Sequence, residues 1–338
     1  MSSFGSFTTG LPARRAVSRP TSTTLERARQ IISRSLEPTP LVAAPELGER
    51  VSLKLESFQP TGSFKVRGAI AACSALPEGS RIVTASAGNH ALGIAWASAR
   101  LGVPATVVVA ETASAAKREA LATLPIELIL HGEDYDAAEA YGLALARDPE
   151  RHATYVSPYN DPQVIAGQST LLDEIIAQTD GDRPLTVVAG VGGGGLVAGI
   201  SMRARELSTA ARPIRVVGVE AEASRAVSAA VRAGDTHEVP IGETVADGLS
   251  GNLEPGSITV GMIAEYTDEL VAVTESDLYG AIRWLARNHG LVAEGAGAAA
   301  TAALLGGKVD ASEGDVVLVI SGRNIALSRL AAILANPD

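Results

Sequence analysis

The stretch Leu185-Thr-Val-Val-Ala-Gly-Val-Gly-Gly-Gly-Gly-Leu196 indicates the fold of this chain. It opens with an apolar run of strand length and ends, after four consecutive glycines, where a helix can begin. A buried apolar strand that leads directly into a helix is typical of parallel sheets covered by helices on both faces. Tetraglycine at this junction is entropically costly, so we interpret it as a loop whose backbone must approach a ligand.

The same alternation of apolar runs and helix-length segments extends over most of the chain and predicts an α/β fold. Thr23 with Glu26 is predicted to cap the first helix, and Ser63 the second. Strands are predicted at 51–56, 81–84, 105–110, 126–130, 153–156, 185–189, 214–220, 269–273 and 316–320. Helices are predicted at 24–36, 64–73, 89–101, 173–178, 196–207, 277–288, 295–305 and 325–334.

Composition narrows the classes of function. A length of 338 residues indicates about two domains, and a net charge of −10 argues against nucleic acid and anionic membranes as partners. No apolar run has the length of a membrane span. The single cysteine, Cys73, excludes a disulfide framework and favours a cytoplasmic protein. Residues 1–20 are rich in Ser, Thr and Arg, and we expect a disordered or loosely docked tail there.

The glycine loop predicts an anion site. Gly192 to Gly195 expose backbone N–H groups without Cβ atoms, and the start of a helix adds partial positive charge, which together suit a phosphate. The loop also satisfies G-x-G-x-x-G through Gly190, Gly192 and Gly195, and Glu220 ends the next strand. A nicotinamide-dependent dehydrogenase is therefore a competing interpretation.

A second informative stretch, Ser57 to Ala69, places Lys65 in a Gly/Ser-rich turn at a helix start. A lysine amine forms a Schiff base with an aldehyde when its surroundings lower its pKa. Phe64 and Val66 supply apolar neighbours, and Arg67 is a candidate cationic partner that would lower the pKa further. An ordinary solvated lysine is the competing interpretation.

Three more loops follow predicted strands or precede helices. Residues 84–90 bring Ser86, Gly88 and Asn89 to a helix start, which suits a substrate carboxylate. Ser321 follows an apolar strand and is either a hydrogen-bond partner for a ring nitrogen or a helix cap. The Gly/Ala-rich start at 294–298 is explained at least as well by tight packing as by ligand binding. A lysine, a phosphate loop, a carboxylate-binding turn and a ring-nitrogen partner together match the needs of pyridoxal phosphate.

The motifs resemble the signature set of fold-type II pyridoxal phosphate enzymes, most closely the serine/threonine dehydratases (threonine ammonia-lyases) and serine racemases. The resemblance covers nearly the whole chain after the tail, in family order. It implies a tryptophan synthase beta-like fold with a large domain of residues 21–81 and 159–338 and a small inserted domain of residues 82–158. The matching segments are Ser63-Phe-Lys-Val-Arg-Gly-Ala69, Ser86-Ala-Gly-Asn-His90, Ala166-Gly-Gln168, Gly192-Gly-Gly-Gly-Leu196 and Ser321-Gly-Arg-Asn324.

The resemblance also implies roles for individual residues. Lys65 would bind the cofactor covalently and remove the α-proton of the substrate. Gly192, Gly193, Gly194, Gly195 and Leu196 would hold the phosphate. Asn89 would face the ring hydroxyl, Phe64 would pack on the ring, and Ser321 would face the ring nitrogen. The substrate carboxylate would bind at Ser86, Ala87, Gly88, Asn89 and His90, with His90 contributing its backbone.

These roles imply elimination of a β-hydroxyl from L-threonine or L-serine, giving a 2-oxo acid and ammonia. A neutral serine hydroxyl leaves the pyridine nitrogen unprotonated, which suits elimination better than transamination. Related racemases carry a serine where this chain has Ala87, so elimination is expected over racemisation. Ala226 replaces an expected carboxylate near Glu220, so no metal site is expected.

Several alternatives stay open. Arg323 replaces a small residue beside Ser321 and either pairs locally with an acid or reaches toward a substrate with an extra acidic or polar group. The second option favours a 3-hydroxyaspartate lyase or another hydroxyamino-acid lyase. A serine racemase and a non-catalytic relative are further alternatives. The resemblance implies a homodimer, and the sequence ends before any C-terminal regulatory domain, so isoleucine feedback is not expected.

Overall fold

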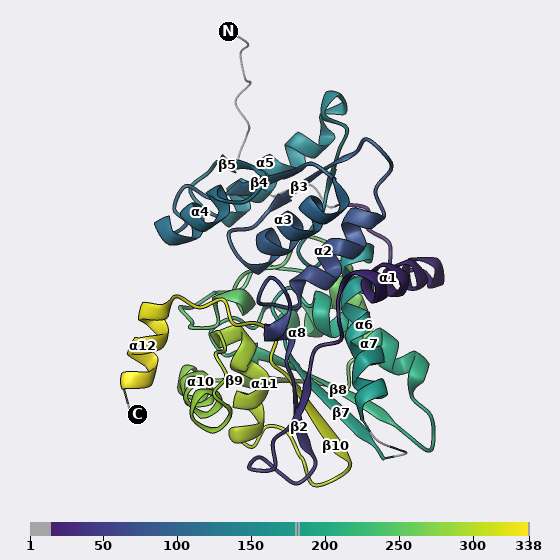
Figure 1. Cartoon of the computed structure of the whole chain (residues 1–338), viewed down its shortest axis with the longest axis vertical. Helices are drawn as coiled ribbons and strands as arrows, with labels where there is room; N and C mark the ends of the chain where they lie inside the picture. Colours follow the sequence, from purple (N-terminus) through teal and green to yellow (C-terminus); the bar gives the residue numbers. More distant parts are fainter. Residues whose placement is uncertain (1–14, 180, 182, 337–338) are drawn as a thin grey trace.

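The strands form two open sheets, one above the other in Figure 1. The computed structural model describes residues 15–179, 181 and 183–336. The larger sheet has the order β1-β2-β10-β7-β8-β9, and the smaller has the order β5-β4-β3-β6. The bounds are β1 Leu41–Ala43, β2 Val51–Lys54, β3 Arg81–Ala85, β4 Ala105–Val109, β5 Glu127–Leu130, β6 Ala153–Tyr155, β7 Leu185–Gly190, β8 Ile214–Ala221, β9 Glu269–Val273 and β10 Asp315–Val319.

The predicted strands are confirmed, with ends shifted by at most two residues. All pairs are parallel except β1 with β2, and β1 is a three-residue edge strand that was not predicted. The predicted α/β architecture of two mostly parallel sheets is therefore confirmed.

Helices cover both sheets, and four of them were not predicted: α4, α5, α8 and α9. The α-helices are α1 Ser22–Ser35, α2 Lys65–Ser74, α3 Asn89–Leu101, α4 Ala115–Ala122, α5 Tyr135–Arg147, α6 Pro162–Gln178, α7 Gly195–Leu207, α8 Ala226–Ala233, α9 Ile258–Tyr266, α10 Glu275–His289, α11 Gly295–Leu305 and α12 Leu327–Ala335. The 3₁₀ turns are η1 Glu56–Phe58, η2 Pro149–Arg151 and η3 Asp247–Leu249.

Two predicted helix caps are wrong. The capping box of α1 is made by Thr21 with Thr24, because the helix begins two residues earlier than predicted. Ser63 does not cap α2: it pairs with Gly322 in an isolated antiparallel bridge, and its hydroxyl is buried without a partner. Helix α2 therefore begins at Lys65 itself.

The core of the larger sheet lies on both of its faces. Along β10, Val316 and Leu318 contribute to one buried cluster, whereas Val317 and Val319 contribute to the other. A strand buried on both faces has no polar positions to alternate with, which explains its continuous apolar sequence. The central strands β7 and β10 thereby fix the loops that follow their carboxyl ends.

A buried ionic network anchors α2. Arg67 donates to Glu56 at 2.7 Å and to Glu174 at 2.6 Å, and Lys54 donates to Glu174 at 2.7 Å. The prediction that Arg67 acts as a cationic neighbour of Lys65 is therefore not supported, since its guanidinium is neutralised by two carboxylates. Although burial works against the charged form, Arg67 holds the pKa of Glu56 below its usual value.

Two further observations concern the single cysteine and the apolar helices. Cys73 is a free, buried thiol whose pKa is raised to about 12 by burial, so it is unreactive. No helix in the described ranges is both long enough and apolar enough for a bilayer crossing.

Candidate active site

Four of the predicted site segments meet at the carboxyl ends of parallel strands. The glycine loop follows β7, Ser321 follows β10, and Asn89 follows β3. Phe64 donates its backbone N–H to the Ser321 carbonyl at 3.0 Å, which joins the Lys65 turn to the end of β10. Open parallel sheets bind ligands at these ends, so the topology brings the predicted residues together where a site is expected.

Lys65 lies at the first position of α2, and its side chain is half-buried. Its Nζ donates to the Pro158 carbonyl at 2.8 Å and lies 5.2 Å from the centroid of the Phe64 ring. Burial lowers the pKa of Lys65 to about 8, and the nearby Glu294 carboxyl opposes that shift. A substantial fraction of the amine is therefore neutral, and nucleophilic, near pH 8.

The glycines of the loop are required by what packs behind them. A Cβ at Gly193 would lie 2.2 Å from the Tyr159 ring, and one at Gly192 would lie 2.9 Å from the Gly248 carbonyl. Gly194 has φ of +86°, a left-handed conformation that favours glycine. Leu196 is buried in the core, so only its backbone can face a ligand.

The backbone amides of this loop are free to bind an anion. Within the described part of the chain, no acceptor bonds the N–H groups of Gly192, Gly193 or Gly194. Helix α7 begins at Gly195, so its first amides also lack intrahelical acceptors. A phosphate would satisfy these donors, and the Lys65 amine would meet an aldehyde. The residues present therefore fit pyridoxal phosphate.

Asn89 and Glu294 form a pair that the sequence did not reveal. Asn89 Nδ2 donates to Glu294 Oε1 at 2.7 Å, and Asn324 Nδ2 donates to Asn89 Oδ1 at 2.6 Å. Burial raises the pKa of Glu294 to about 7. In the sequence, Glu294 is a single acid before a Gly/Ala-rich helix start, and tight packing of the small residues was enough to explain that pattern.

The predicted substrate loop lies at the start of α3. Ser86 Oγ accepts the N–H of Gly88 at 3.2 Å. Burial, reinforced by the charge of Lys65, lowers the pKa of His90 to about 3, and its Nε2 lies 3.3 Å from the Val156 carbonyl. A neutral, enclosed imidazole carries no charge at neutral pH, so an acid–base role for the His90 side chain has no support here.

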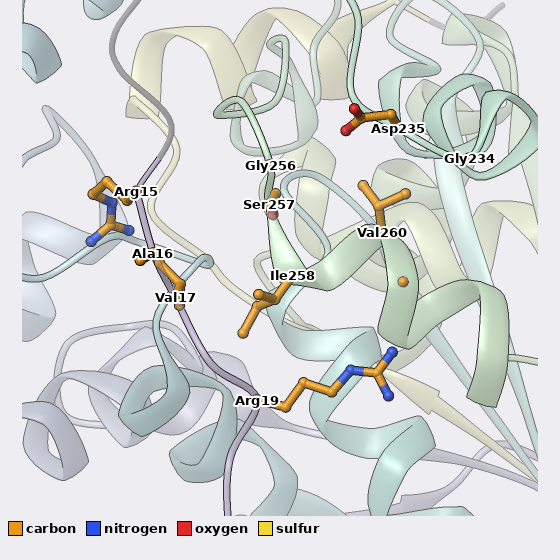
Figure 2. Close-up of a pocket in the computed structure, with 11 residues that line it drawn as sticks. Arg15, Ala16, Val17, Arg19, Gly234, Asp235, Gly256, Ser257, Ile258 and Val260 are labelled. Atoms are coloured by element: carbon orange, nitrogen blue, oxygen red, sulfur yellow. The ribbon is translucent and has the colours of Figure 1, made fainter.

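Ser86 and Ala87 also line a cavity of about 240 Å³ within the smaller sheet's half of the molecule. Lys65, the glycine loop and Ser321 are not among the residues that line it. A larger cavity, about 560 Å³, lies between residues 15–19 and the start of α9 (Figure 2), and no predicted site residue lines it.

The side chains of Ser321 and Arg323 contact different parts of the molecule. Ser321 Oγ is buried and donates to the Ala296 carbonyl at 3.3 Å, a long hydrogen bond. Arg323 donates to the Ser57 carbonyl, and its guanidinium lies over the Phe58 ring. Arg323 is thus held by a backbone carbonyl and an aromatic ring that are distant in the chain, and not by the acid expected of a local pair.

Glu220 is engaged elsewhere as well. Its carboxylate accepts the backbone N–H groups of Val227 and Ser228 at 3.0 and 3.1 Å, at the start of α8. A carboxylate that caps a helix in this way is not free to bind a ribose, which removes the main support for a nicotinamide site.

Comparison with known proteins agrees with this geometry. The family model for pyridoxal-phosphate dependent enzymes matches residues 32–322. An L-threonine ammonia-lyase of Thermotoga maritima is 39% identical over 85% of this chain and 70% of its own length. A catabolic L-threonine dehydratase of Staphylococcus aureus is 35% identical over 92% of this chain and 90% of its own length.

Solved structures give the same result. The processed form of threonine deaminase isoform 2 from Solanum lycopersicum superposes with a TM-score of 0.79 at 28% identity, covering 97% of this chain and 98% of the other. A serine racemase from Dictyostelium discoideum superposes with a TM-score of 0.81 at 28% identity, covering 91% and 99%. With a family model that spans most of its length, this chain belongs to the pyridoxal-phosphate dependent enzymes.

Proposed function

We propose that this enzyme is a threonine/serine ammonia-lyase that removes the β-hydroxyl of L-threonine or L-serine and releases a 2-oxo acid and ammonia. The setting of Lys65 carries the proposal. Of the four lysines in the chain, Lys54 is bonded to Glu174, whereas Lys117 and Lys308 are exposed. Lys65 has a half-buried amine with a lowered pKa, and it bonds Pro158, next to the Tyr159 ring that packs behind the glycine loop. The two curated relatives named above are a threonine ammonia-lyase and a threonine dehydratase, which supports this activity.

The cofactor, when bound, supplies an electron sink that makes the Cα proton of an amino acid removable. Lys65 would hold the cofactor and, as a neutral amine with a pKa of about 8, would take the Cα proton. Residues Gly192 to Leu196 would bind the phosphate through backbone amides. Phe64 would support the ring and Asn89 would face its hydroxyl, with Glu294 fixing the Asn89 amide.

The substrate carboxylate would bind the loop Ser86, Ala87, Gly88, Asn89 and His90 at the start of α3. Ser321, a neutral donor, would face the ring nitrogen and keep the electron sink modest. A modest electron sink favours elimination over transamination, which needs a longer-lived carbanion. Ala87 cannot donate a proton to the opposite face of the substrate, which favours elimination over racemisation.

The domain division, the oligomeric state and the cellular location are also proposed. We propose a large cofactor-binding domain of residues 21–81 and 159–338 and a small domain of residues 82–158, which contains the four-stranded sheet apart from the first residue of β3. A cytoplasmic homodimer working in amino-acid metabolism is expected from the family.

A 3-hydroxyaspartate lyase is the second candidate, and the contacts of Arg323 with the Ser57 carbonyl and the Phe58 ring give it no support. A substrate panel tests the proposal: the holoenzyme is incubated with L-threonine, L-serine and L-threo-3-hydroxyaspartate, and ammonia and 2-oxo acid are measured. We expect L-threonine and L-serine to react and Lys65→Ala to abolish both reactions. Turnover of 3-hydroxyaspartate alone, or of no hydroxyamino acid, would contradict the assignment.

A further inference from the structure

Arg15 reaches from the N-terminal segment into a buried part of the molecule. Its guanidinium bonds both carboxylate oxygens of Glu254, at 3.1 Å from Nη2 to Oε2, and donates to the Asn160 carbonyl at 2.7 Å. The same group lies 5.2 Å from the centroid of the Tyr155 ring. Figure 2 shows Arg15 and Arg19 leaving this segment in different directions.

Glu254 depends on that contact. Its side chain is only 2% exposed, and Arg15 is the cation that pairs with it in the described part of the chain. Its other side-chain partner is the hydroxyl of Ser157, at 3.5 Å. A buried carboxylate that loses its cation is strongly unfavourable, so without Arg15 the region around Glu254 must protonate, hydrate or rearrange.

The Glu254 region supports the glycine loop from behind. The backbone N–H of Glu254 donates to Tyr159 Oη at 2.6 Å, and the Tyr159 ring fills the space behind Gly193. From the same region, Thr259 donates its hydroxyl to the Gly193 carbonyl at 2.8 Å. A shift of Glu254 would therefore be transmitted to the loop through two contacts.

The segment that Arg15 bonds also contacts the lysine. Residues 157–160 include Asn160, whose carbonyl accepts from Arg15, and Pro158, whose carbonyl accepts from Lys65 at 2.8 Å. Asn160 Oδ1 additionally accepts the N–H of Ile258 at the start of α9. Arg15 thus joins the two segments, 157–160 and 254–259, that hold the loop and the lysine.

We propose that Arg15 is a positioning residue for cofactor binding, which it promotes by neutralising Glu254 and fixing the segments behind the glycine loop. The inference rests on the proposed function only in requiring that pyridoxal phosphate is the cofactor. Arg15 touches neither cofactor nor substrate, so the expected defect is in affinity, with little change in turnover once the site is saturated.

Arg19 provides a matched control. It belongs to the same segment and lines the same cavity, but its partner is the exposed Glu265, at 2.6 Å. Its loss removes one arginine from the segment without leaving a buried charge. A nonspecific effect of altering this segment would appear equally in Arg15→Ala and Arg19→Ala.

The test measures the dissociation constant of pyridoxal 5'-phosphate for apoenzyme by absorbance titration, well below the unfolding temperature. We expect Arg15→Ala to weaken binding by about tenfold or more, with kcat at saturating cofactor within about twofold of the unaltered enzyme. Arg19→Ala should bind normally. Arg15→Lys, which keeps a charge, and the double variant Arg15→Ala/Glu254→Gln, which removes both charges, should each recover part of the affinity.

Unchanged affinity in Arg15→Ala, or equal losses in Arg15→Ala and Arg19→Ala, would overturn the inference. If Arg15→Ala does not fold, Arg15→Gln, which keeps a long polar side chain without the charge, decides: affinity equal to that of the unaltered enzyme in Arg15→Gln also overturns it. Failure of the unaltered protein to bind the cofactor would instead contradict the proposed function.

Discussion

The Lys65 amine titrates in a range that controls its reaction with an aldehyde. Burial lowers its pKa to about 8, so the neutral, nucleophilic fraction grows as pH rises and reaches half near that value. An exposed lysine reaches half only near pH ~10.4. We expect the rate of covalent cofactor attachment to apoenzyme to rise through about pH 8 and then level off, as followed by absorbance after mixing. A rate that keeps rising through about pH 10 would contradict this setting for the amine.

Ala87 is the residue at which elimination and racemisation are expected to separate. With the substrate on the loop proposed for it, Ala87→Ser would place there a hydroxyl that could deliver a proton to the face opposite Lys65. We expect measurable racemisation of L-serine or L-alanine, by chiral chromatography, where the unaltered enzyme shows little. Ala113→Ser lines the same cavity and should show no gain. Absence of racemisation of both substrates in Ala87→Ser would argue against the role given to this position.

The sequence predicted which residues lie at the ends of strands and the starts of helices, but it did not predict the hydrogen-bond partners of those residues. Lys65, Asn89 and Ser321 stand beside predicted strands and helix starts, where local patterns are strong. The partners of Asn89 and Arg323 are far away in the chain: Glu294 lies 205 residues from Asn89, and Ser57 lies 266 residues from Arg323. Such contacts arise from the packing of distant elements, which no local pattern encodes.

The loop between β7 and α7 packs against Tyr159 on one side, whereas the backbone N–H groups of Gly192 to Gly194 are left without acceptors in the described part of the chain. Gly193→Ala would drive a Cβ to 2.2 Å from Tyr159, which the buried ring can relieve only by moving. We expect a loss of about 1–3 kcal/mol in apoenzyme stability and weaker cofactor binding. Gly280→Ala, in open space on α10, should instead leave stability unchanged or raise it by roughly 0.5–1 kcal/mol. Urea unfolding and cofactor titration measure both. Normal binding by Gly193→Ala would contradict the packed-loop description.

Element prediction succeeded where burial is continuous. Strands β7, β8 and β10 are buried along most of their length, and each carries a mainly apolar run. Helix α4 was missed because Leu121 is its one buried residue, which leaves no apolar stripe in the sequence. The failed cap at Ser63 has a different cause: the chain pairs there with Gly322, and this tertiary contact displaces the helix start.

At the scale of the whole molecule, the ion pairs of Arg67 connect α2, which begins at Lys65, with η1 and α6. Arg67→Ala would leave Glu56 buried without its cation, and we expect a loss of about 3–5 kcal/mol in the free energy of unfolding. Arg81→Ala removes a more exposed pair with Glu127 and should cost less than about 1 kcal/mol. Urea unfolding of the apoenzymes compares them, and equal costs would refute the buried-network account.

The central claim is that Lys65 is the residue to which pyridoxal phosphate attaches. The holoenzyme is treated with borohydride, which fixes the lysine–cofactor bond, and is then digested and mapped by mass spectrometry. The four lysines make the result unambiguous. We predict that the cofactor mass is found on the peptide containing Lys65. Its presence on a peptide containing Lys54, Lys117 or Lys308, or on no peptide, would contradict the account.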